Sequence, residues 1–138
     1  MKPISVTVRL KTAIRGEDTI LSTYGGLLRV KEGEWQISYT EEAEGARSST
    51  LLTLKEDRIT LKKQGASCFS TVFLVGEEHR SLYSVGPLAL DAVTRTHSLA
   101  VSSSGELPSA AWSYELTLGG ETRSFSITLS LTNREVEE

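Results

Sequence analysis

The chain has 138 residues, of which 38% are hydrophobic, and a formal net charge of −3. This length suffices for one domain with its own core, and the ordinary balance of apolar and charged residues argues against disorder. The mild acidity gives no electrostatic reason to expect nucleic acid or an anionic membrane surface as a partner.

Alternation of apolar and polar residues, the pattern of half-buried β-strands, recurs along nearly the whole chain. It begins with Ile4, Val6, Val8 and Leu10, and it ends with Phe125, Ile127, Leu129 and Leu131. Turn signals near residues 16, 33, 56, 77, 104 and 119 separate the alternating runs. No segment carries a persuasive helical stripe. The sequence therefore predicts an all-β protein.

Tight turns test this prediction, because a turn fixes which residues lie opposite each other. Two-residue loops at 32–33, 56–57 and 119–120 predict the pairs Val30–Trp35, Leu54–Ile59 and Tyr114–Phe125. A wider loop around residues 16–18 predicts Leu10 opposite Tyr24 and Val6 opposite Leu28. The apolar faces coincide in all four hairpins. Consecutive strands are thus predicted to be antiparallel neighbours.

A meander of about eight to ten strands in a chain of this size is expected to curl, because sheets twist and open edges invite aggregation. Closure removes both edges. We therefore predict an antiparallel up-and-down β-barrel in residues 1–133, followed by a charged C-terminal tail at 134–138. A two-sheet sandwich is the alternative.

One predicted strand, "CFSTVFLV" at residues 68–75, is apolar on both faces. Cys68, Val72 and Leu74 alternate with Phe69, Phe73 and Val75. An apolar outer face indicates that something covers it. Two interpretations remain open: a subunit contact that makes a homodimer through residues 68–75, and a packed loop or terminal segment.

Three stretches, "WQISYTEEAEG", "TLLTLKEDRITLKKQG" and "STVFLVGEEHRSLYSVGPLAL", occur in the order typical of the YwiB-like proteins. The chain resembles this uncharacterised bacterial family from Val6 to about Leu131. The matching positions are Tyr39, Glu41, Gly45, Thr50, Gly65, Phe73, His79, Ser81, Tyr83 and Gly86. One turn departs from the family, since Ser84-Val85-Gly86 replaces the usual Thr-Pro-Tyr-Gly. The resemblance implies a calycin-like (lipocalin-like) barrel and brings no established ligand or reaction.

The sequence also favours a cytoplasmic location. The start, "MKPISVTVRL", lacks the apolar run of a signal peptide, and no segment approaches the length that crosses a bilayer. The single cysteine, Cys68, cannot form an internal disulfide, which suits a reducing compartment. Two histidines without chelating spacing predict no metal site, and no cofactor is expected.

The stretch "HRSLYSVG" at residues 79–86 concentrates polar groups. His79 and Ser81 share one strand face, which allows a hydrolase-like hypothesis with Tyr83 or Glu41 as a further group. With no strand-turn-helix motif around the serine, polar residues leaving a hairpin turn are the favoured interpretation.

Glu41, Glu42 and Glu44 form an acidic cluster close to Arg47. A solvated face is the favoured interpretation. In the functional interpretation, Glu41, Arg47 and Arg80 lie at one barrel mouth and contact a polar ligand.

The interior remains the strongest candidate for a binding site. Six aromatic residues share the face of the aliphatic core: Tyr24, Trp35, Tyr39, Trp112, Tyr114 and Phe125. They could line a pocket or fill the barrel.

We predict a binding module for a small, largely apolar ligand. Its predicted ligand-binding residues are Tyr39, Glu41, Arg47, His79, Arg80, Tyr83, Trp112 and Tyr114. The alternatives are a filled, self-associating barrel and a hydrolase-like enzyme that uses His79.

Overall fold

Ten β-strands make up nearly all of the chain that the structure describes. The computed structural model describes residues 3–43, 45–103 and 107–134. The strands are β1 Ile4–Ile14, β2 Ile20–Lys31, β3 Glu34–Ala43, β4 Ala46–Leu54, β5 Ile59–Gly65, β6 Ser67–Phe73, β7 Glu78–Val85, β8 Leu88–Ser102, β9 Ser109–Leu118 and β10 Glu121–Asn133.

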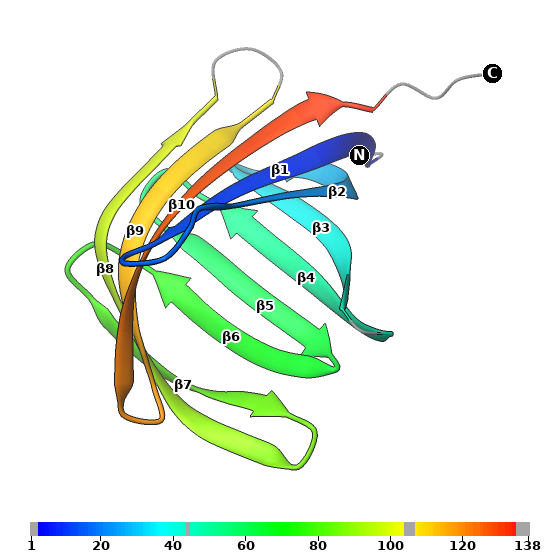
Figure 1. Ribbon diagram of the computed structural model, residues 1–138. Helices are drawn as coiled ribbons and strands as arrows, with labels where there is room; N and C mark the ends of the chain where they lie inside the picture. The colour runs from blue at the N-terminus through cyan, green and yellow to red at the C-terminus, as the bar shows by residue number, and fades with distance from the viewer. Residues whose placement is uncertain (1–2, 44, 104–106, 135–138) are drawn as a thin grey trace.

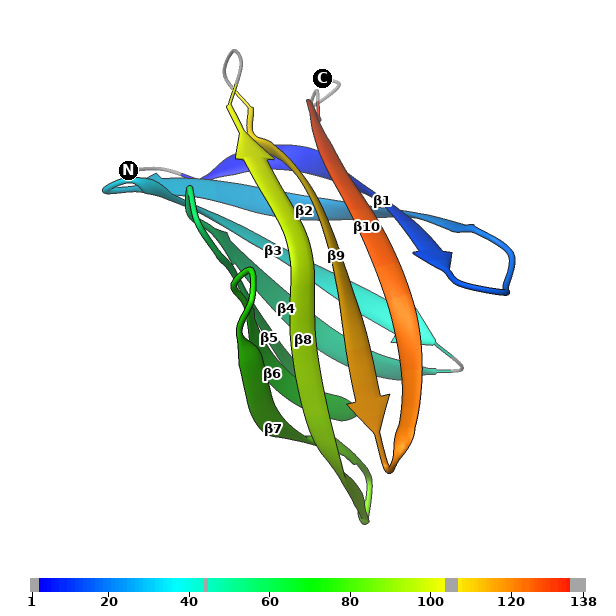
Figure 2. The same cartoon turned by 90° about the vertical axis from the view of Figure 1, so that its left-hand side faces the viewer.

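The strands form one antiparallel sheet that closes on itself (Figure 1 and Figure 2). Each strand pairs with its neighbours in sequence, and β1 also pairs with β10, from Val6–Asn133 to Ile14–Phe125. Closure leaves the sheet of the described residues without an open edge. The predicted up-and-down barrel is confirmed. The sandwich is excluded, because all the strands of the described chain belong to a single sheet.

The three hairpins with two-residue loops have the predicted register. Val30 pairs with Trp35, Leu54 with Ile59 and Tyr114 with Phe125. In the last of these hairpins, Gly119 and Gly120 have φ angles of 59° and 88°. Positive φ at both central residues is required by the type I′ turn, whose twist matches that of the flanking strands. This turn therefore fixes the register locally.

The first hairpin differs from the prediction by two residues. Leu10 lies opposite Ser22, and Val8 lies opposite Tyr24. The turn starts earlier than predicted, because the N–H of Glu17 donates to the carbonyl of Ile14 (2.9 Å) and β1 runs to Ile14, where it still pairs with β10. A shift of two residues keeps every side chain on its predicted face.

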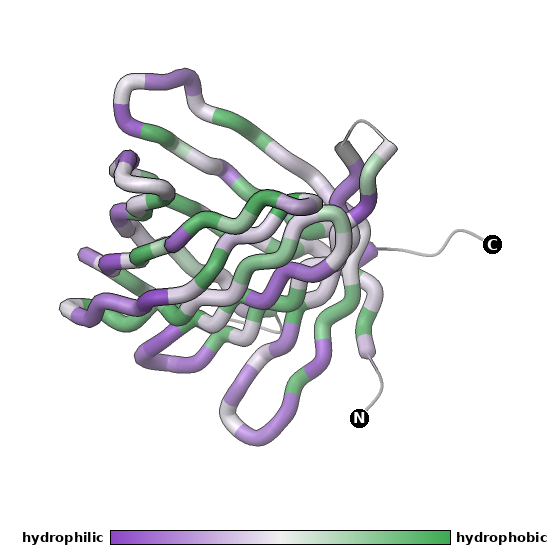
Figure 3. The backbone as a smooth tube through the Cα atoms, turned by 90° about the horizontal axis from the view of Figure 1, so that it is seen from below, coloured by the Kyte–Doolittle hydropathy of each residue, from purple (hydrophilic) through white to green (hydrophobic). Residues whose placement is uncertain are grey.

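The two ends of the barrel are different. Because consecutive strands alternate in direction, the connections β1–β2, β3–β4, β5–β6, β7–β8 and β9–β10 lie at one end, here called the open end. The start of β1, the end of β10 and the other connections lie at the closed end. Figure 3 shows hydrophobic and hydrophilic residues alternating along the strands between these two ends.

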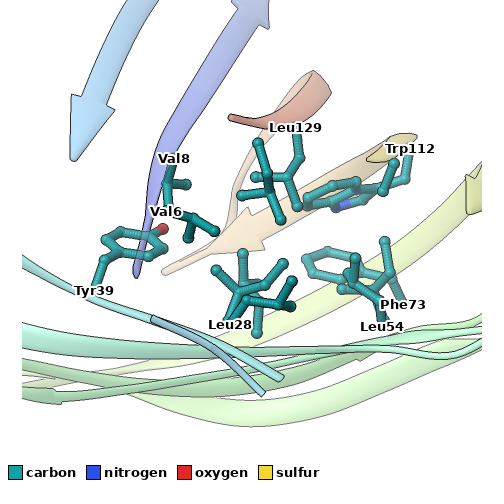
Figure 4. Close-up of a cluster of buried hydrophobic side chains, with 13 residues drawn as sticks. Val6, Val8, Leu28, Tyr39, Leu54, Phe73, Trp112 and Leu129 are labelled. Atoms are coloured by element: carbon teal, nitrogen blue, oxygen red, sulfur yellow. The ribbon is translucent and has the colours of Figure 1, made fainter. Parts of the chain in front are cut away.

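The hydrophobic core fills the closed end. Its side chains come from most of the strands and include Val6, Leu28, Ile37, Leu54, Ile59 and Leu129, each 0% exposed. Figure 4 shows several of them converging from facing walls, with Tyr39 at one side and Phe73 beneath Trp112. A fully packed end blocks entry to the interior from that side.

The outer face of the segment 68–75 is more exposed than its inner face. Phe69, Thr71 and Phe73 point inward, whereas Cys68 is exposed and Val72 is half-buried. Val75 lies beyond the end of β6 and is 52% exposed, so it does not share the face of Phe69 and Phe73 as predicted. Among the residues that the structure describes, no loop or terminal segment buries this outer face.

The first residue of the predicted C-terminal tail, Arg134, is bonded to the barrel. The backbone N–H of Arg134 donates to the carbonyl of Ser5 (3.1 Å), so this residue is tied to β1. The rest of the predicted tail, residues 135–138, lies outside the described residues.

Candidate functional site

The barrel interior contains a cavity of about 200 Å³ between the packed core and the open end. Its walls come from β1, β3, β4, β5, β6, β9 and β10. The lining residues are Leu10, Thr12, Tyr39, Thr50, Leu52, Leu61, Lys63, Phe73, Trp112, Tyr114, Phe125 and Ile127. The lining is mainly apolar, with a few polar groups at defined places, as in small-molecule sites.

Glu41 is the centre of a cluster of polar side chains on the inner face of β2 to β5. We define this polar cluster as Tyr24, Glu41, Thr50 and Lys63. The ammonium group of Lys63 lies 2.9 Å from Oε2 of Glu41. The hydroxyls of Thr50 and Tyr24 donate to Oε2 and Oε1 of the same carboxylate, at 3.0 and 3.2 Å. Both carboxylate oxygens are thus bonded, and the charges of Glu41 and Lys63 compensate each other.

The polar cluster is in contact with solvent while it faces inward. The side chains of Glu41 and Lys63 are each 26% exposed. Burial alone would raise the pKa of Glu41, but bonds from Lys63, Thr50 and Tyr24 to its charged form give a net lowering of this pKa. Glu41 is therefore a carboxylate at neutral pH.

Tyr24 of this cluster and the neighbouring Tyr39 are both held in the neutral form. Tyr24 and Tyr39 stack with ring centroids 4.7 Å apart. Burial raises the pKa of both hydroxyls, and the negative charge of Glu41 raises it further. Neither tyrosine is suited to lose a proton at neutral pH.

The opposite part of the cavity is an aromatic wall, which we define as Phe73, Trp112, Tyr114 and Phe125. Tyr114 stacks on Phe125 with centroids 5.1 Å apart, and Phe73 lies 4.6 Å from Tyr114 and 5.6 Å from Trp112. Burial raises the pKa of Tyr114 to about 12. This wall offers flat apolar surface to an occupant.

A sequence model of a family described as a domain of unknown function, DUF1934, matches residues 4–130. The chain belongs to this family. The crystal structure of the ywiB protein from Bacillus subtilis is similar to this DUF1934 chain, with a TM-score of 0.82, 20% sequence identity, and coverage of 95% of this chain and 94% of that chain. At this identity the likeness concerns the fold. The predicted resemblance is confirmed, and no curated protein matches the sequence.

Five of the predicted residues of the DUF1934 chain face the barrel interior. Tyr39, Trp112 and Tyr114 line the cavity, and Glu41 lies in the polar cluster. Tyr83 points inward from β7 and contacts Phe69, with centroids 5.7 Å apart. The structure therefore brings together predicted residues from β3 and β9, far apart in sequence.

Three predicted residues do not join this group. Arg47 is exposed, and its Nε donates to Glu42 (2.9 Å) on the outside of β3 and β4. Arg80 also points outward and pairs with Glu78. His79 faces inward, but it lies at the start of β7 and hence at the closed end.

The predicted common mouth of Glu41, Arg47 and Arg80 is therefore wrong. Strands β3 and β7 run in the same direction, because consecutive strands alternate. Arg80 lies near the start of β7 and Glu41 near the end of β3, so the two residues lie at opposite ends of the barrel. Glu44, the third predicted acidic residue, lies outside the described residues.

The geometry gives no support to a serine nucleophile activated by His79. The hydroxyl of Ser81 is buried and has no hydrogen-bond partner within the described chain, so it is not bonded to His79. Glu41 lies at the other end of the barrel. A general base must be within hydrogen-bond reach of the group that it deprotonates.

Sequence reasoning missed Lys63 as a site residue. The strand alternation could have found it, because Ile59 and Leu61 point inward and Lys63 has the same parity. The register then places it opposite Thr50, which is itself opposite Tyr39.

A larger hollow of about 630 Å³ lies on the outer face of β2 to β5. Its lining includes the outward-facing residues Leu27, Ser38, Ser49, Leu51 and Lys62. It does not include the charged pair of the polar cluster.

The described residues hold no group of three His, Cys, Asp or Glu side chains placed to bind a metal ion. A helix of the length and apolarity needed to cross a membrane is likewise absent from the described part of the chain.

Proposed function

We propose that this DUF1934 domain binds one small, largely apolar molecule inside its barrel, in the manner of calycins. The observation that supports this most directly is the cavity of about 200 Å³ between the aromatic wall and the polar cluster. An engineered apolar cavity of about 150 Å³ binds benzene, so this volume suits a molecule somewhat larger than one benzene ring.

The two ends of the barrel support the same proposal. The closed end is packed with fully buried side chains, so an occupant would rest on a rigid floor. At the open end, inward-pointing Glu41 and Lys63 keep contact with solvent, which provides a way in. The apolar groups behind this entrance would supply the contact surface for a largely apolar molecule.

A cavity-filling variant tests the proposal with two defined probes, acetophenone and isopropylbenzene. We expect both to raise the melting temperature of the wild type. Leu61→Trp, which places a large side chain in the cavity, should abolish the rise. Leu51→Trp makes the same change on the outer face of β4 and should keep it. Probes that bind neither protein, or that bind Leu61→Trp as well as the wild type, would contradict the proposal.

Self-association is a second candidate function, favoured by apolar side chains on the outer face. Val75 follows the end of β6, Leu82 lies on β7 and Leu88 begins β8, and they are 52%, 58% and 56% exposed. We propose that this surface pairs two copies of the chain. Leu82→Lys with Leu88→Lys should convert a dimer into a monomer in light scattering, whereas a wild type that is already monomeric excludes the idea.

We also propose a cytoplasmic location, which the exposed, free thiol of Cys68 supports. Cell fractionation of the native host tests this, and recovery of the protein outside the cytoplasm would contradict it.

A further inference from the structure

The indole N–H of Trp112 is a buried donor without an acceptor. Trp112 is 5% exposed, and its Nε1 has no hydrogen-bond partner among the residues that the structure describes. Indole nitrogen can only donate, and leaving a buried donor without an acceptor is unfavourable. Buried polar groups that lack a partner in the protein often have one in a bound molecule or an ordered water.

Trp112 is one of the residues that line the interior cavity. Trp112 extends from β9 into the barrel and lies over Phe73 (Figure 4), and both residues line the cavity. The rings of Phe73, Tyr114 and Phe125 continue the same wall. An occupant that stacks on this wall would also contact the indole ring of Trp112.

The electrostatics of the cavity disfavour a charged occupant. Among the described residues Lys63 is the one charged residue in the lining, and its ammonium is already paired with Glu41 at 2.9 Å. A carboxylate brought near Lys63 would also approach Glu41, and an ammonium brought near Glu41 would approach Lys63. Either ion would leave a net charge in a partly buried site.

We propose that the ligand is an uncharged aromatic molecule with one acceptor atom, such as a carbonyl oxygen, that accepts a hydrogen bond from Nε1 of Trp112. This inference rests on the proposed function and narrows its ligand class. Ring stacking on the aromatic wall supplies affinity, and the single acceptor fixes the orientation.

The inferred hydrogen bond is tested by comparing the binding of two probes to the wild type and to Trp112→Phe. Acetophenone carries the acceptor, and isopropylbenzene has a methyl group in place of the oxygen. Trp112→Phe keeps an aromatic ring and removes the donor. We expect it to weaken acetophenone binding about 2- to 13-fold more than isopropylbenzene binding, which corresponds to one hydrogen bond of about 0.5–1.5 kcal/mol. Trp35→Phe, at a tryptophan packed against the core and outside the cavity lining, is the matched control and should leave the ratio of the two affinities unchanged.

The outcomes separate the two proposals. If neither probe binds the wild type, the proposed function fails. If both probes bind but Trp112→Phe weakens them equally, the proposed function stands and the inferred hydrogen bond from Trp112 is contradicted. This result is expected if the N–H of Trp112 is satisfied by the ring of Phe73. Benzoate binding more tightly than acetophenone would overturn the uncharged character.

A second measurement needs no variant. In ¹H–¹⁵N spectra of the wild type, acetophenone should move the Trp112 indole N–H resonance downfield, and isopropylbenzene should not. Equal shifts with both probes would contradict the inference even if Trp112→Phe failed to fold.

Discussion

At the scale of single residues, the contrast between two neighbouring lysines shows how strand geometry assigns different roles to one residue type. Lys62 is exposed on the outer face of β5. Lys63 is half-buried and pairs with Glu41 in the interior. Their side chains leave opposite faces of the strand because the period of a β-strand is two.

Lys63→Met should destabilise the protein by about 1–3 kcal/mol, because Glu41 would remain half-buried without its cation. Urea denaturation measures the loss. Lys62→Met is the matched control, and a change within about 0.5 kcal/mol is expected for such a surface position. Equal effects of the two substitutions would show that the ion pair does not stabilise the fold.

Glu41 should make stability depend on acidity. The pKa of Glu41 in the folded protein lies below its ordinary value of 4.5. The folded state therefore binds this proton less readily than the unfolded state does. The stabilisation is complete above the unfolded pKa and is lost as the pH falls through the folded pKa.

Comparison with Glu41→Gln isolates this contribution. The melting temperature of the wild type should exceed that of the variant at about pH 7, and the difference should shrink as the pH falls below about 4.5. A difference that stays constant between about pH 7 and about pH 3 would contradict the assignment.

At the scale of strands and hairpins, much of the structure follows from short-range patterns. Period-two alternation predicts the strands and the direction of Trp112 and Tyr114, because one face of each strand is buried. Two-residue turns predict register, since they allow one pairing only. The wider first loop does not fix its register, and the structure differs there by two residues.

The site was harder to predict than the strands, for physical reasons. Charged side chains are rarely buried, so the charge of Lys63 favours an outward direction. Its position in the strand alternation, two residues after Leu61, favours an inward direction instead. Its contact with Glu41 joins β5 to β3, which are separated by β4. Such a diagonal contact depends on the tilt and stagger of the closed barrel, and no local pattern specifies these.

Gly65, at the end of β5, should be the least replaceable glycine of the turns. Its φ is +126°, and an added Cβ would lie 2.5 Å from the carbonyl oxygen of Arg47. Gly65→Ala should therefore cost more than the about 1–3 kcal/mol of an unfavourable backbone conformation alone. Gly76→Ala is the control, because φ is +81° there and no atom lies within 4 Å of the added Cβ. Equal losses of unfolding free energy would contradict this.

At the scale of the whole molecule, closure joins the two ends of the chain. The pairing of β1 with β10 brings Val8 opposite Leu131 and Leu10 opposite Leu129. The same pairing brings Thr12 opposite Ile127, and both residues line the cavity, so the cavity exists only when the barrel is closed. Because this contact spans nearly the full sequence, it carries the largest loop-closure entropy of any pairing in the fold.

Hydrogen exchange tests closure directly. In an edge strand, every second amide points away from its one neighbour and exchanges with solvent, whereas a strand paired on both sides has all its amides bonded. We therefore expect the amides of β1 and β10 to exchange as slowly as those of β8 and β9, and to become exposed together with them in one cooperative opening. If about half of the amides in β1 and β10 exchanged rapidly while β8 and β9 stayed protected, the sheet would be open in solution. An open sheet would also remove the cavity wall formed by Leu10, Phe125 and Ile127, and with it the basis for a ligand in the interior.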